Sequence, residues 1–395
     1  MFRSVFSKII IFFIIVILAV GALAVTRTPA EATPGSVGDF GNAAAMPVSL
    51  DWPADGQAAI GASGYGLLAV HGDQTPVSIA SVSKIITALA VLQKKPLSVG
   101  DQGPMITITQ EDFDSYNNYY LEGGSVARVA VGEQISEYQA LQGALLPSAN
   151  NLADTLARWA FGSIDAYSAY ADKMVGSMGL SHTTVGSASG FDDKTLSTAA
   201  DLTHIGQAAL DNPVLAQIVK EETATIPAAG TVRNVNWLLG ANGVIGIKTG
   251  NTDQAGGCFL FAAQHKIAGQ SVTMVGAVLA APTLNASIAD SRVLLASIDK
   301  NFRMVQVAKR GEGILTYRTP WNETAEAIAD KDVSLLAWNG DALKLKKDLH
   351  AVGVPSAKGT YVGSTTIYSE DKSVTVPLVL TSPIHGPSLT WRLKN

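Results

Sequence analysis

The chain has 395 residues, of which 47% are hydrophobic and only 15% are charged. This composition is typical of well-packed globular domains, and the length allows one large domain and a smaller one. The formal net charge of −5 gives no basic excess, so nucleic acid is not an expected partner. The single cysteine, Cys258, excludes an intramolecular disulfide and a multi-cysteine metal site, and we expect it to be a buried small side chain.

The N-terminal segment predicts export from the cytoplasm. Arg3 and Lys8 precede an uninterrupted apolar run from Ile9 to Val25, and positive charges on that side orient the rest of the chain outward. The run is at the lower bound for crossing a bilayer and long for a secretion signal. Cleavage at Ala22-Leu23-Ala24 is an open alternative. Because the closing residues 391–395 indicate no amphipathic anchoring helix, we expect the N-terminal run to be retained as a membrane anchor.

Hydrophobic patterning predicts strands, then a block of helices, then further strands and a final helix. The expected strands lie within 57–71, 244–263 and 271–281, and the expected helical stretches cover 81–96, 136–211 and 284–307. This succession favours an α/β (α+β) sandwich with a mostly helical lobe.

Beyond about residue 313 the pattern is typical of a small all-β domain. Strands are expected at 333–338, 342–345, 365–368 and 373–380. The first two should form a hairpin, because Asn339-Gly340 is a preferred tight-turn pair, and Pro377 should lie on an edge strand. We therefore expect a membrane anchor or signal segment in 1–26, a linker in 27–45, an α/β domain in 46–310 and a β domain in 313–395.

A serine nucleophile needs a base, either a histidine or a lysine kept neutral by its surroundings. The chain contains no G-x-S-x-G elbow and no H-E-x-x-H motif, and its six histidines are scattered. The motif Ser-x-x-Lys occurs three times, at 81–84, 297–300 and 369–372. Three occurrences show that the motif alone is weakly specific, because common residues recur at a fixed spacing by chance.

Only the first of these motifs opens an apolar helix. Lys84 then lies one turn after Ser81 on the same face, within reach of the hydroxyl. A helix N-terminus also offers unpaired N–H groups and a positive dipole end to a developing anion. Burial on this helix would lower the pKa of the Lys84 amine, as a general base requires, whereas Lys300 and Lys372 lie in charged or turn segments. An ordinary N-cap is the alternative interpretation of Ser81.

Two further motifs follow in the chain. Ser148-Ala149-Asn150 precedes a predicted helix, and Lys248-Thr249-Gly250 ends the strand-like segment 244–247. A second Ser-x-Asn, Ser115-Tyr116-Asn117, lies in a polar tyrosine-rich segment that we expect at the surface. Each motif alone is typical of an N-cap or a strand-end turn. In the order Ser-x-x-Lys, Ser-x-Asn, Lys-Thr-Gly they form the signature of penicillin-recognising serine enzymes.

Over most of residues 46–310 the chain resembles the low-molecular-weight D-alanyl-D-alanine carboxypeptidases. The resemblance is carried by 80–84, 145–153, 178–180, 190–193, 196–202 and 246–257. The tail, with Val376-Pro377-Leu378-Val379 and Trp391-Arg392-Leu393, resembles the β domain that follows in this family. The resemblance implies a penicillin-binding/β-lactamase-like transpeptidase fold, with a mostly helical lobe and a small all-β C-terminal domain.

The resemblance also implies a mechanism. Ser81 would attack the carbonyl between the two terminal D-alanines of a peptidoglycan stem, while neutral Lys84 takes its proton. Ser148 and Lys248 would relay a proton to the leaving D-alanine, and water would then hydrolyse the acyl-enzyme. β-Lactams would be covalent inhibitors of the same serine. No metal and no organic cofactor is implied.

For substrate binding the resemblance implies a set of five residues, namely Asn150, Lys248, Thr249, Gly250 and Asn251. Asn150 would orient both the base and the substrate amide, and Lys248 with Thr249 would hold the terminal carboxylate. The backbone N–H groups of Ser81 and Asn251 would form an oxyanion hole, in which each donor is typically worth a few kcal/mol.

The chain departs from the family pattern at several positions. The family commonly has Thr at Ser83, Gly at Ala149, Asp at Asn151 and His at Asn251. Some members carry an arginine near Pro282, where this chain has Ala280-Ala281-Pro282, so one part of the carboxylate clamp is unassigned.

Two alternatives stay open. A class A-type β-lactamase shares the three motifs but needs a deacylating glutamate between the second and the third. The first glutamates in that interval are Glu221 and Glu222, late and in a charged cluster. A catalytically silent cell-wall binding homologue would use the fold without the chemistry, and the intact motifs argue against it.

Overall fold

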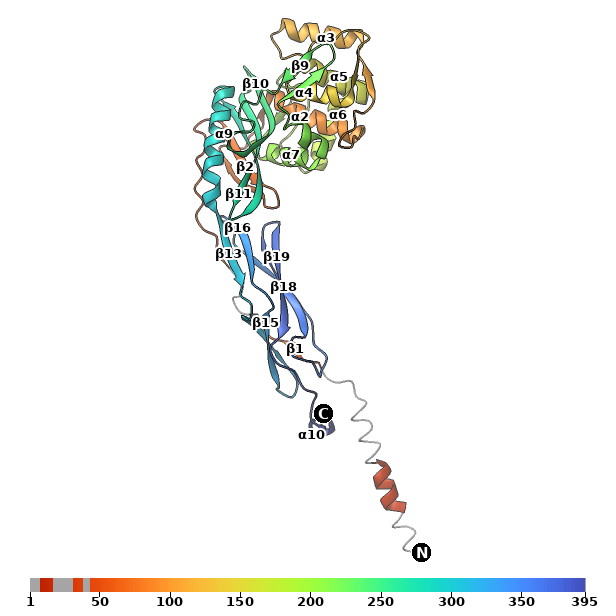
Figure 1. The fold of residues 1–395 in the computed structure, drawn as a ribbon, viewed down its shortest axis with the longest axis vertical. Coiled ribbons are helices and arrows are strands. Elements are labelled where there is room, and N and C mark those ends of the chain that lie inside the picture. Colours follow the sequence, from red (N-terminus) through yellow and green to blue (C-terminus); the bar gives the residue numbers. More distant parts are fainter. Residues whose placement is uncertain (1–7, 17–30, 38–42, 395) are drawn as a thin grey trace. The chain divides into compact units, whose positions relative to one another are not determined.

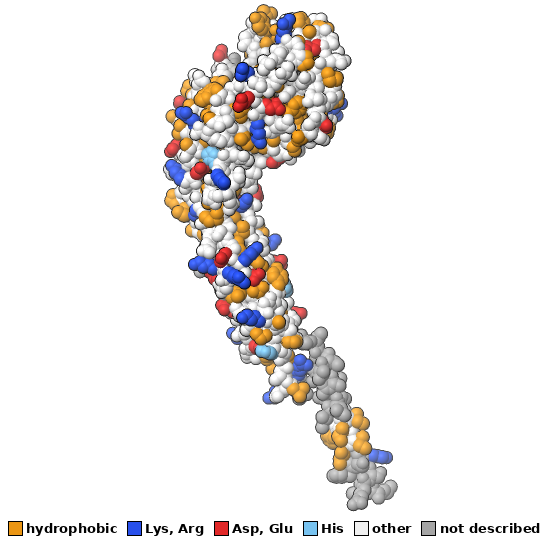
Figure 2. All heavy atoms as spheres, in the orientation of Figure 1, with side chains coloured by type: hydrophobic (Ala, Val, Ile, Leu, Met, Phe, Trp, Pro, Cys, Tyr) orange, Lys and Arg blue, Asp and Glu red, His pale blue; other side chains and the backbone are white. Residues whose placement is uncertain are grey.

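A computed structural model of the chain describes residues 8–16, 31–37 and 43–394 (Figure 1). The chain divides into two compact units, each with its own hydrophobic core. The larger unit spans Pro47–Phe302, and the smaller unit joins the chain from Arg303 onward to the residues before Pro47. On the face shown in Figure 2, acidic and basic side chains are interspersed over each unit.

A five-stranded antiparallel sheet forms the centre of the larger unit, in the order β10-β11-β12-β2-β3. Its strands are β2 (Gln57–Ala62), β3 (Gly66–His71), β10 (Val244–Thr252), β11 (Gly256–Ile267) and β12 (Gln270–Ala281). Helices α7 (Ala199–Asp211) and α9 (Leu284–Ile298) pack on it, and Figure 1 shows them on opposite sides. All six residues of β2 are buried because both of its faces are covered.

The remaining helices of the larger unit form the lobe that the sequence predicted. They are α2 (Ser83–Lys94), α3 (Gln110–Leu121), α4 (Glu137–Leu145), α5 (Asn150–Phe161), α6 (Ile164–Ser177) and α8 (Pro213–Ile218). Three short strand pairs join them: β4 (Val77–Ser78) with β7 (Leu196–Ser197), β5 (Met105–Thr107) with β6 (Gln134–Ser136), and β8 (Thr223–Ile226) with β9 (Gly230–Arg233). Helix α2 contacts α4, α5, α6 and α7 and is buried along nearly its whole length.

The helix expected from Ser81 begins with a single 3₁₀ turn, η1 (Ala80–Val82), and continues as α2. It ends at Lys94, two residues before Pro96, the last residue of the stretch expected to be helical. The N-cap positions of η1 and α2 are Ile79 and Val82, and neither makes a side-chain capping bond. Ser81 is therefore not an ordinary N-cap, and its hydroxyl is available to another partner.

The predicted helix over 284–307 is wrong in its last third. Helix α9 ends at Ile298, a 3₁₀ turn, η3 (Asp299–Asn301), follows, and β13 (Phe302–Ala308) is a strand paired with β16. Burial alternates over residues 303–306 of β13, as expected for a strand covered on one face. The single strand-like segment 57–71 is in fact a hairpin of two strands, turned by glycines with positive φ such as Gly64.

The smaller unit is all-β, as predicted. A six-stranded sheet runs in the order β1-β14-β15-β19-β18-β17, beside the pair β13–β16. Its strands are β1 (Thr33–Pro34), β14 (Gly313–Arg318), β15 (Thr324–Ala329), β16 (Val333–Trp338), β17 (Lys344–Leu349), β18 (Tyr361–Ser369) and β19 (Lys372–Leu380). Strands β18 and β19 form the second strand pair that the sequence predicted.

Two predictions for this unit are wrong. The segments around Asn339-Gly340 do not form a hairpin, because β16 pairs with β13 and β17 pairs with β18. Pro377 lies on β19, an inner strand between β15 and β18. The Pro377 carbonyl accepts a hydrogen bond from the Asp330 N–H, just beyond the end of β15. The N–H that the proline lacks would face the same side, beyond the last pair of that ladder, Ala329 with Leu378.

Among the residues that the structure describes, no helix is long and apolar enough to cross a bilayer. Residues 8–16 are helical, and most of the expected anchor or signal segment lies outside the described residues. The C-terminal residues, expected to lack an anchoring helix, contain the six-residue helix α10 (Leu389–Lys394).

Candidate active site

Ser81 lies where the backbone of three segments comes together. Ala80, directly before it, has a φ of 47°, a left-handed conformation that is uncommon outside glycine. A Cβ on Gly190 would lie 2.0 Å from the Ala80 carbonyl oxygen, and a Cβ on Gly250 would lie 3.0 Å from the Ser81 nitrogen. Glycine at both positions therefore allows β10 and the loop before β7 to approach the backbone of η1 closely.

The Lys84 amine is held by three oxygen atoms. Its Nζ lies 2.7 Å from the Ser81 hydroxyl, 2.7 Å from the Asn150 side-chain oxygen and 2.7 Å from the Ser189 backbone carbonyl. The last two atoms can only accept hydrogen bonds. When the amine is neutral, its two N–H groups donate to them, and its lone pair is directed at the Ser81 hydroxyl. The geometry therefore orients the lysine to take a proton from this serine.

Burial makes the neutral form of this amine accessible. Lys84 is 1% exposed, and desolvation lowers its pKa well below the usual value. The positive charge of Lys248 acts in the same direction, whereas the negative charge of Asp154 opposes it. The sequence-based prediction of a buried lysine with a lowered pKa at this position agrees with these features.

Ser148 and Lys248 form a second pair. Ser148 is buried and adopts a φ of 66° two residues before the start of α5, and Lys248 is buried on β10. The Lys248 Nζ donates to the Ser148 hydroxyl at 2.9 Å and to the Thr249 carbonyl at 2.9 Å. Desolvation lowers the pKa of Lys248 to about 7, so its charge is sensitive to pH near neutrality.

The start of α5 is tied to the segment before α4. The Asn150 N–H donates to the Ser125 carbonyl, while the Asn150 side chain contacts Lys84. Asn151, which stands where the family commonly has Asp, is fully buried. Its amide accepts a bond from the Ala127 N–H and donates one to the Ala127 carbonyl. A carboxylate could accept the first bond but could not donate the second, so the amide suits this contact.

The Lys-Thr-Gly motif lies on β10, which is an edge strand of the five-stranded sheet. Thr249 and Gly250 are buried, and Asn251 is exposed at the same end of the strand. Gly250 pairs with Cys258 on β11. Cys258 is 0% exposed, and burial raises its thiol pKa to about 11, which confirms that it is a buried small residue.

The structure thus brings together residues from all three motifs, because Lys84 contacts Ser81 and Asn150, and Gly250 adjoins Ser81. The serines of the other two Ser-x-x-Lys motifs, Ser297 and Ser369, donate their hydroxyl hydrogen bonds to groups other than a lysine. The Ser297 hydroxyl donates to the Leu294 carbonyl, and the Ser369 hydroxyl donates to Asp341. Ser115-Tyr116-Asn117 lies on α3 and is half-buried rather than superficial, with the Ser115 hydroxyl near Asp154.

Sequence reasoning missed three residues behind the lysine. Ser189 supplies the carbonyl that Lys84 contacts, and the Tyr119 hydroxyl lies between the Ser189 hydroxyl and the Asp154 carboxylate. Asp154 follows Asn150 by four residues, so the two side chains share one face of α5. That spacing was the one signal available in the sequence.

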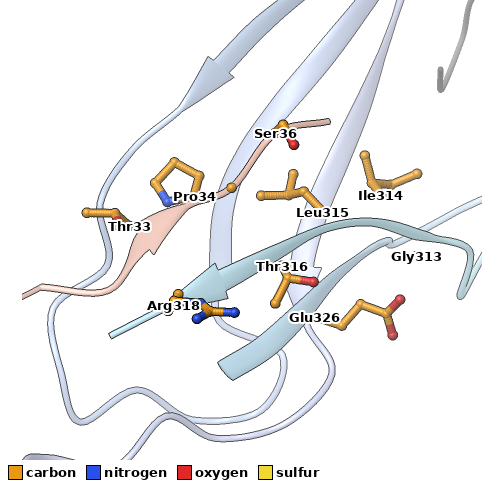
Figure 3. Close-up of a pocket in the computed structure, with 10 residues that line it drawn as sticks. Thr33, Pro34, Ser36, Gly313, Ile314, Leu315, Thr316, Arg318 and Glu326 are labelled. Carbon is orange, nitrogen blue, oxygen red and sulfur yellow. The ribbon is translucent and has the colours of Figure 1, made fainter. Parts of the chain in front are cut away.

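A pocket of about 570 Å³ lies in the smaller unit (Figure 3). It is lined by the short strand β1 and the residues after it, by β14 and by Glu326 of β15, and Figure 3 shows Thr316 between Arg318 and Glu326. None of the motif residues lines this pocket.

Comparisons with known proteins show the family and the fold of the chain. The sequence profile of the family described as D-alanyl-D-alanine carboxypeptidase matches residues 54–283. The D-alanyl-D-alanine carboxypeptidase DacA of Escherichia coli (strain K12) is 29% identical over 319 residues, which cover 77% of each chain. The crystal structure of the Streptomyces K15 DD-transpeptidase matches with a TM-score of 0.55 at 26% identity, covering 65% of this chain and 98% of that one. Penicillin-binding protein 5 from Haemophilus influenzae shares the fold, with a TM-score of 0.60 at 21% identity over 87% of this chain and 100% of its own.

The fold and the family match define a serine peptidase built on the transpeptidase fold of the penicillin-binding proteins. Because the profile covers more than half of the chain, this protein belongs to the D-alanyl-D-alanine carboxypeptidase family. The family and the fold that the three motifs predicted are both confirmed.

Proposed function

We propose that the protein removes the terminal D-alanine from peptidoglycan stem peptides through an acyl-enzyme on Ser81. In the first step the Ser81 oxygen attacks the carbonyl between the two D-alanines, and Lys84 takes the hydroxyl proton. The bond to the leaving D-alanine then breaks, and its nitrogen receives a proton. Water attacks the resulting ester, which releases the shortened stem and frees Ser81.

One observation carries this proposal. Of the three oxygens around the Lys84 amine, the Ser81 hydroxyl alone can give up a proton. The amine is buried, and desolvation lowers its pKa. A serine hydroxyl in contact with a neutral lysine is the activated nucleophile that a peptidase without a catalytic histidine requires.

The remaining motif residues supply the other parts of the reaction. Ser148, in contact with Lys248, carries the proton to the leaving nitrogen. Lys248 and Thr249 bind the terminal carboxylate, and Asn150 binds the substrate amide. The N–H groups of Ser81 and Asn251 stabilise the tetrahedral intermediate, because Gly250 allows the β10 backbone to lie against that of η1.

A β-lactam acylates Ser81 in the same way, since its strained amide presents a carbonyl and a carboxylate at a similar separation. No glutamate suited to rapid hydrolysis of that ester is indicated between the second and third motifs. Glu221, the first glutamate in that interval, accepts hydrogen bonds from Tyr138 and Gln142 of α4. We therefore expect slow release of the penicilloyl group.

The test is to incubate the ectodomain with a fluorescent penicillin and, separately, with a peptide ending in D-Ala-D-Ala. Durable labelling and release of D-alanine are expected, and both should be absent in Ser81→Ala. Ser297→Ala is the matched control, because Ser297 also begins a Ser-x-x-Lys motif but is bonded to the Leu294 carbonyl. Rapid turnover of the penicillin would indicate a β-lactamase, and an unreactive wild type would indicate a binding homologue.

We further propose that the enzyme acts outside the cytoplasm, held at the cell membrane by residues 1–26 or released after their cleavage. The charged and apolar residues of that segment support this location. Fractionation of cells that express the full chain, and a variant beginning after residue 26, provides the test. Full-length protein in the cytosolic fraction would contradict the proposal.

A further inference from the structure

A row of hydroxyl groups leads away from Lys84 and ends at a buried carboxylate. Asp154 of α5 is 9% exposed. Its Oδ2 accepts a hydrogen bond from the Tyr119 hydroxyl at 2.9 Å, and the Ser115 hydroxyl lies 3.4 Å from the same oxygen. The Tyr119 hydroxyl lies 3.1 Å from the Ser189 hydroxyl. The Ser189 carbonyl is one of the three acceptors of the Lys84 amine.

The hydrogen atoms in this row have one consistent arrangement. The Phe191 N–H donates to the Ser189 hydroxyl oxygen at 3.3 Å, which leaves the Ser189 hydrogen free to donate to Tyr119. Tyr119 has a single hydroxyl hydrogen, which it donates to Asp154. Every hydrogen bond in the row is therefore directed toward Asp154, as expected when the carboxylate at its end is ionised.

We propose that Asp154 is a positioning residue for the acylation step, which holds Ser189 through Tyr119 and whose negative charge sets the acid limit of Ser81 reactivity. This inference rests on the proposed function. The held residue, Ser189, provides the carbonyl that binds one N–H of the amine. A fixed carbonyl at this place keeps the lone pair of the amine directed at the nucleophile.

The effect of the Asp154 charge on the pKa of Lys84 follows from the burial of both groups and from the sign of that charge. A negative charge near Lys84 favours its ammonium form, and Asp154 raises the pKa of Lys84 against the larger lowering by desolvation and by Lys248. The pKa of Asp154 is itself raised, because desolvation outweighs the lowering by its bond from Tyr119 and by the charges of Arg158 and Lys84. The carboxyl group and the amine are therefore coupled.

The charged and titratable groups around this pair come from several elements. Arg158 lies one turn later on α5, Tyr119 on α3, Tyr167 on α6, Lys248 on β10, and Asp192 in the loop beside Tyr119. Arg158 is bonded at 2.7 Å to Asp112. The direct contacts of Asp154 are instead neutral hydroxyls, so its charge is not neutralised by a contacting cation and remains effective at Lys84.

The experiment measures the rate of Ser81 acylation by a fluorescent penicillin as a function of pH, in the wild type and in Asp154→Asn. The amide keeps the size of the carboxylate and can still accept the Tyr119 bond, but it carries no charge. We expect the rising acid limb of the profile to shift to lower pH, because Lys84 then loses its proton more easily. The rate at the plateau should fall by no more than about fivefold, the equivalent of one weakened hydrogen bond.

Asp201→Asn is the matched control. Asp201 is also a buried carboxylate that accepts bonds from a hydroxyl and a backbone N–H, those of Thr183 and His182, but it does not act on Lys84. Its acid limb should coincide with that of the wild type. An equal shift in both variants would overturn the specific role of Asp154.

Tyr119→Phe keeps the inference testable if Asp154→Asn does not fold. The ring can keep its edge contact with Phe191, but the hydroxyl bond that lowers the pKa of Asp154 is lost. The carboxyl group is then protonated over more of the acid range, and the limb should shift in the same direction. An unmoved limb in a variant that is still labelled would overturn the inference. Absence of labelling in the wild type would instead overturn the proposed function itself.

Discussion

The Lys248 amine lies 2.9 Å from the Ser148 hydroxyl, although 100 residues separate the two in the chain. Ser148 lies in the turn just before α5 of the helical lobe, and Lys248 lies on β10 of the sheet. The pair therefore exists only where the lobe and the sheet meet in the larger unit. Lys248 also donates to its neighbouring Thr249 carbonyl, so loss of the serine would leave the amine partly bonded.

Replacement of Ser148 by alanine should slow acylation of Ser81 by a factor of about 10² to 10⁴, the usual contribution of a positioned proton-transfer group. The hydroxyl that carries a proton to the leaving nitrogen is removed, while Ser81 and Lys84 keep their contact. The measurement is the labelling rate with a penicillin and the release rate of D-alanine. Ser177→Ala, at the end of α6, is the control and should leave both rates unchanged. Equal rates in Ser148→Ala and the wild type would contradict the relay.

The affinity for a peptide substrate should fall as the pH rises through about 7. The pKa of Lys248 is lowered to about 7 by burial, so the amine is charged below that pH and neutral above it. Because only the charged form attracts the terminal carboxylate, kcat/KM for D-Ala-D-Ala peptides should decrease on the alkaline side. In Lys248→Arg the charge persists, and the decrease should move to higher pH, with a lower maximum. A decrease at the same pH in both proteins would exclude Lys248 as its cause.

Replacement of Gly250 by alanine should abolish most of the activity without unfolding the protein. An alanine Cβ would lie 2.9 Å from the Ile79 carbonyl and 3.0 Å from the Ser81 nitrogen, so β10 and η1 must separate by a few tenths of an ångström. Loss of one oxyanion donor typically costs a factor of about 10² to 10³ in kcat. Gly176→Ala on α6 is the control, because nothing lies within 4 Å of its added Cβ. If both variants retained full activity, the close approach would have no part in catalysis.

A buried glutamate should make stability depend on pH. Both carboxylate oxygens of Glu137 are buried without a hydrogen-bond partner, and burial raises its pKa from 4.5 to about 7. Because the folded state holds the proton more tightly than the unfolded state, the contribution to stability is full below pH 4.5. It is lost between 4.5 and about 7, by up to about 3 kcal/mol at about 1.4 kcal/mol per pH unit.

Glu137→Gln should remove this dependence, so that the variant gains stability relative to the wild type as the pH rises from 5 to 8. Urea unfolding at several pH values measures the difference. The exposed Glu222 provides the control substitution, Glu222→Gln, which should follow the wild type. Parallel curves for the wild type and Glu137→Gln would show that this carboxyl is not protonated in the folded protein.

The sequence predicted the grouping of the motif residues better than it predicted the strand pairing of the tail. Ser81, Lys84, Ser148 and Lys248 could be selected because their motifs state both the residue types and their order. The contact of Lys84 with the Ser189 carbonyl could not be predicted, because any residue can supply a backbone carbonyl. Strand pairing in the smaller unit failed for a related reason. Asn339-Gly340 indicates a turn, but the choice of β13 as the partner of β16 depends on distant contacts.

The contact of Tyr119 with Asp154 could not be predicted from the sequence either. A segment with three tyrosines, acidic residues and asparagines has the composition of an exposed surface, and α3 is indeed largely polar. One face of that helix nevertheless packs on α5, where Tyr119 reaches Asp154. Composition describes a helix as a whole, whereas function here depends on one side chain on its inner face.

The two close glycine contacts around η1 bear on when the surroundings of Ser81 form during folding. Gly190 and Gly250 belong to segments that lie more than a hundred residues further along the chain than Ala80, which both of them touch. Ser81 therefore acquires its reactive surroundings only after both distant segments have docked on it. On the proposed function, Ser81 of an unfolded chain lacks these surroundings, and penicillin labelling would count folded molecules only.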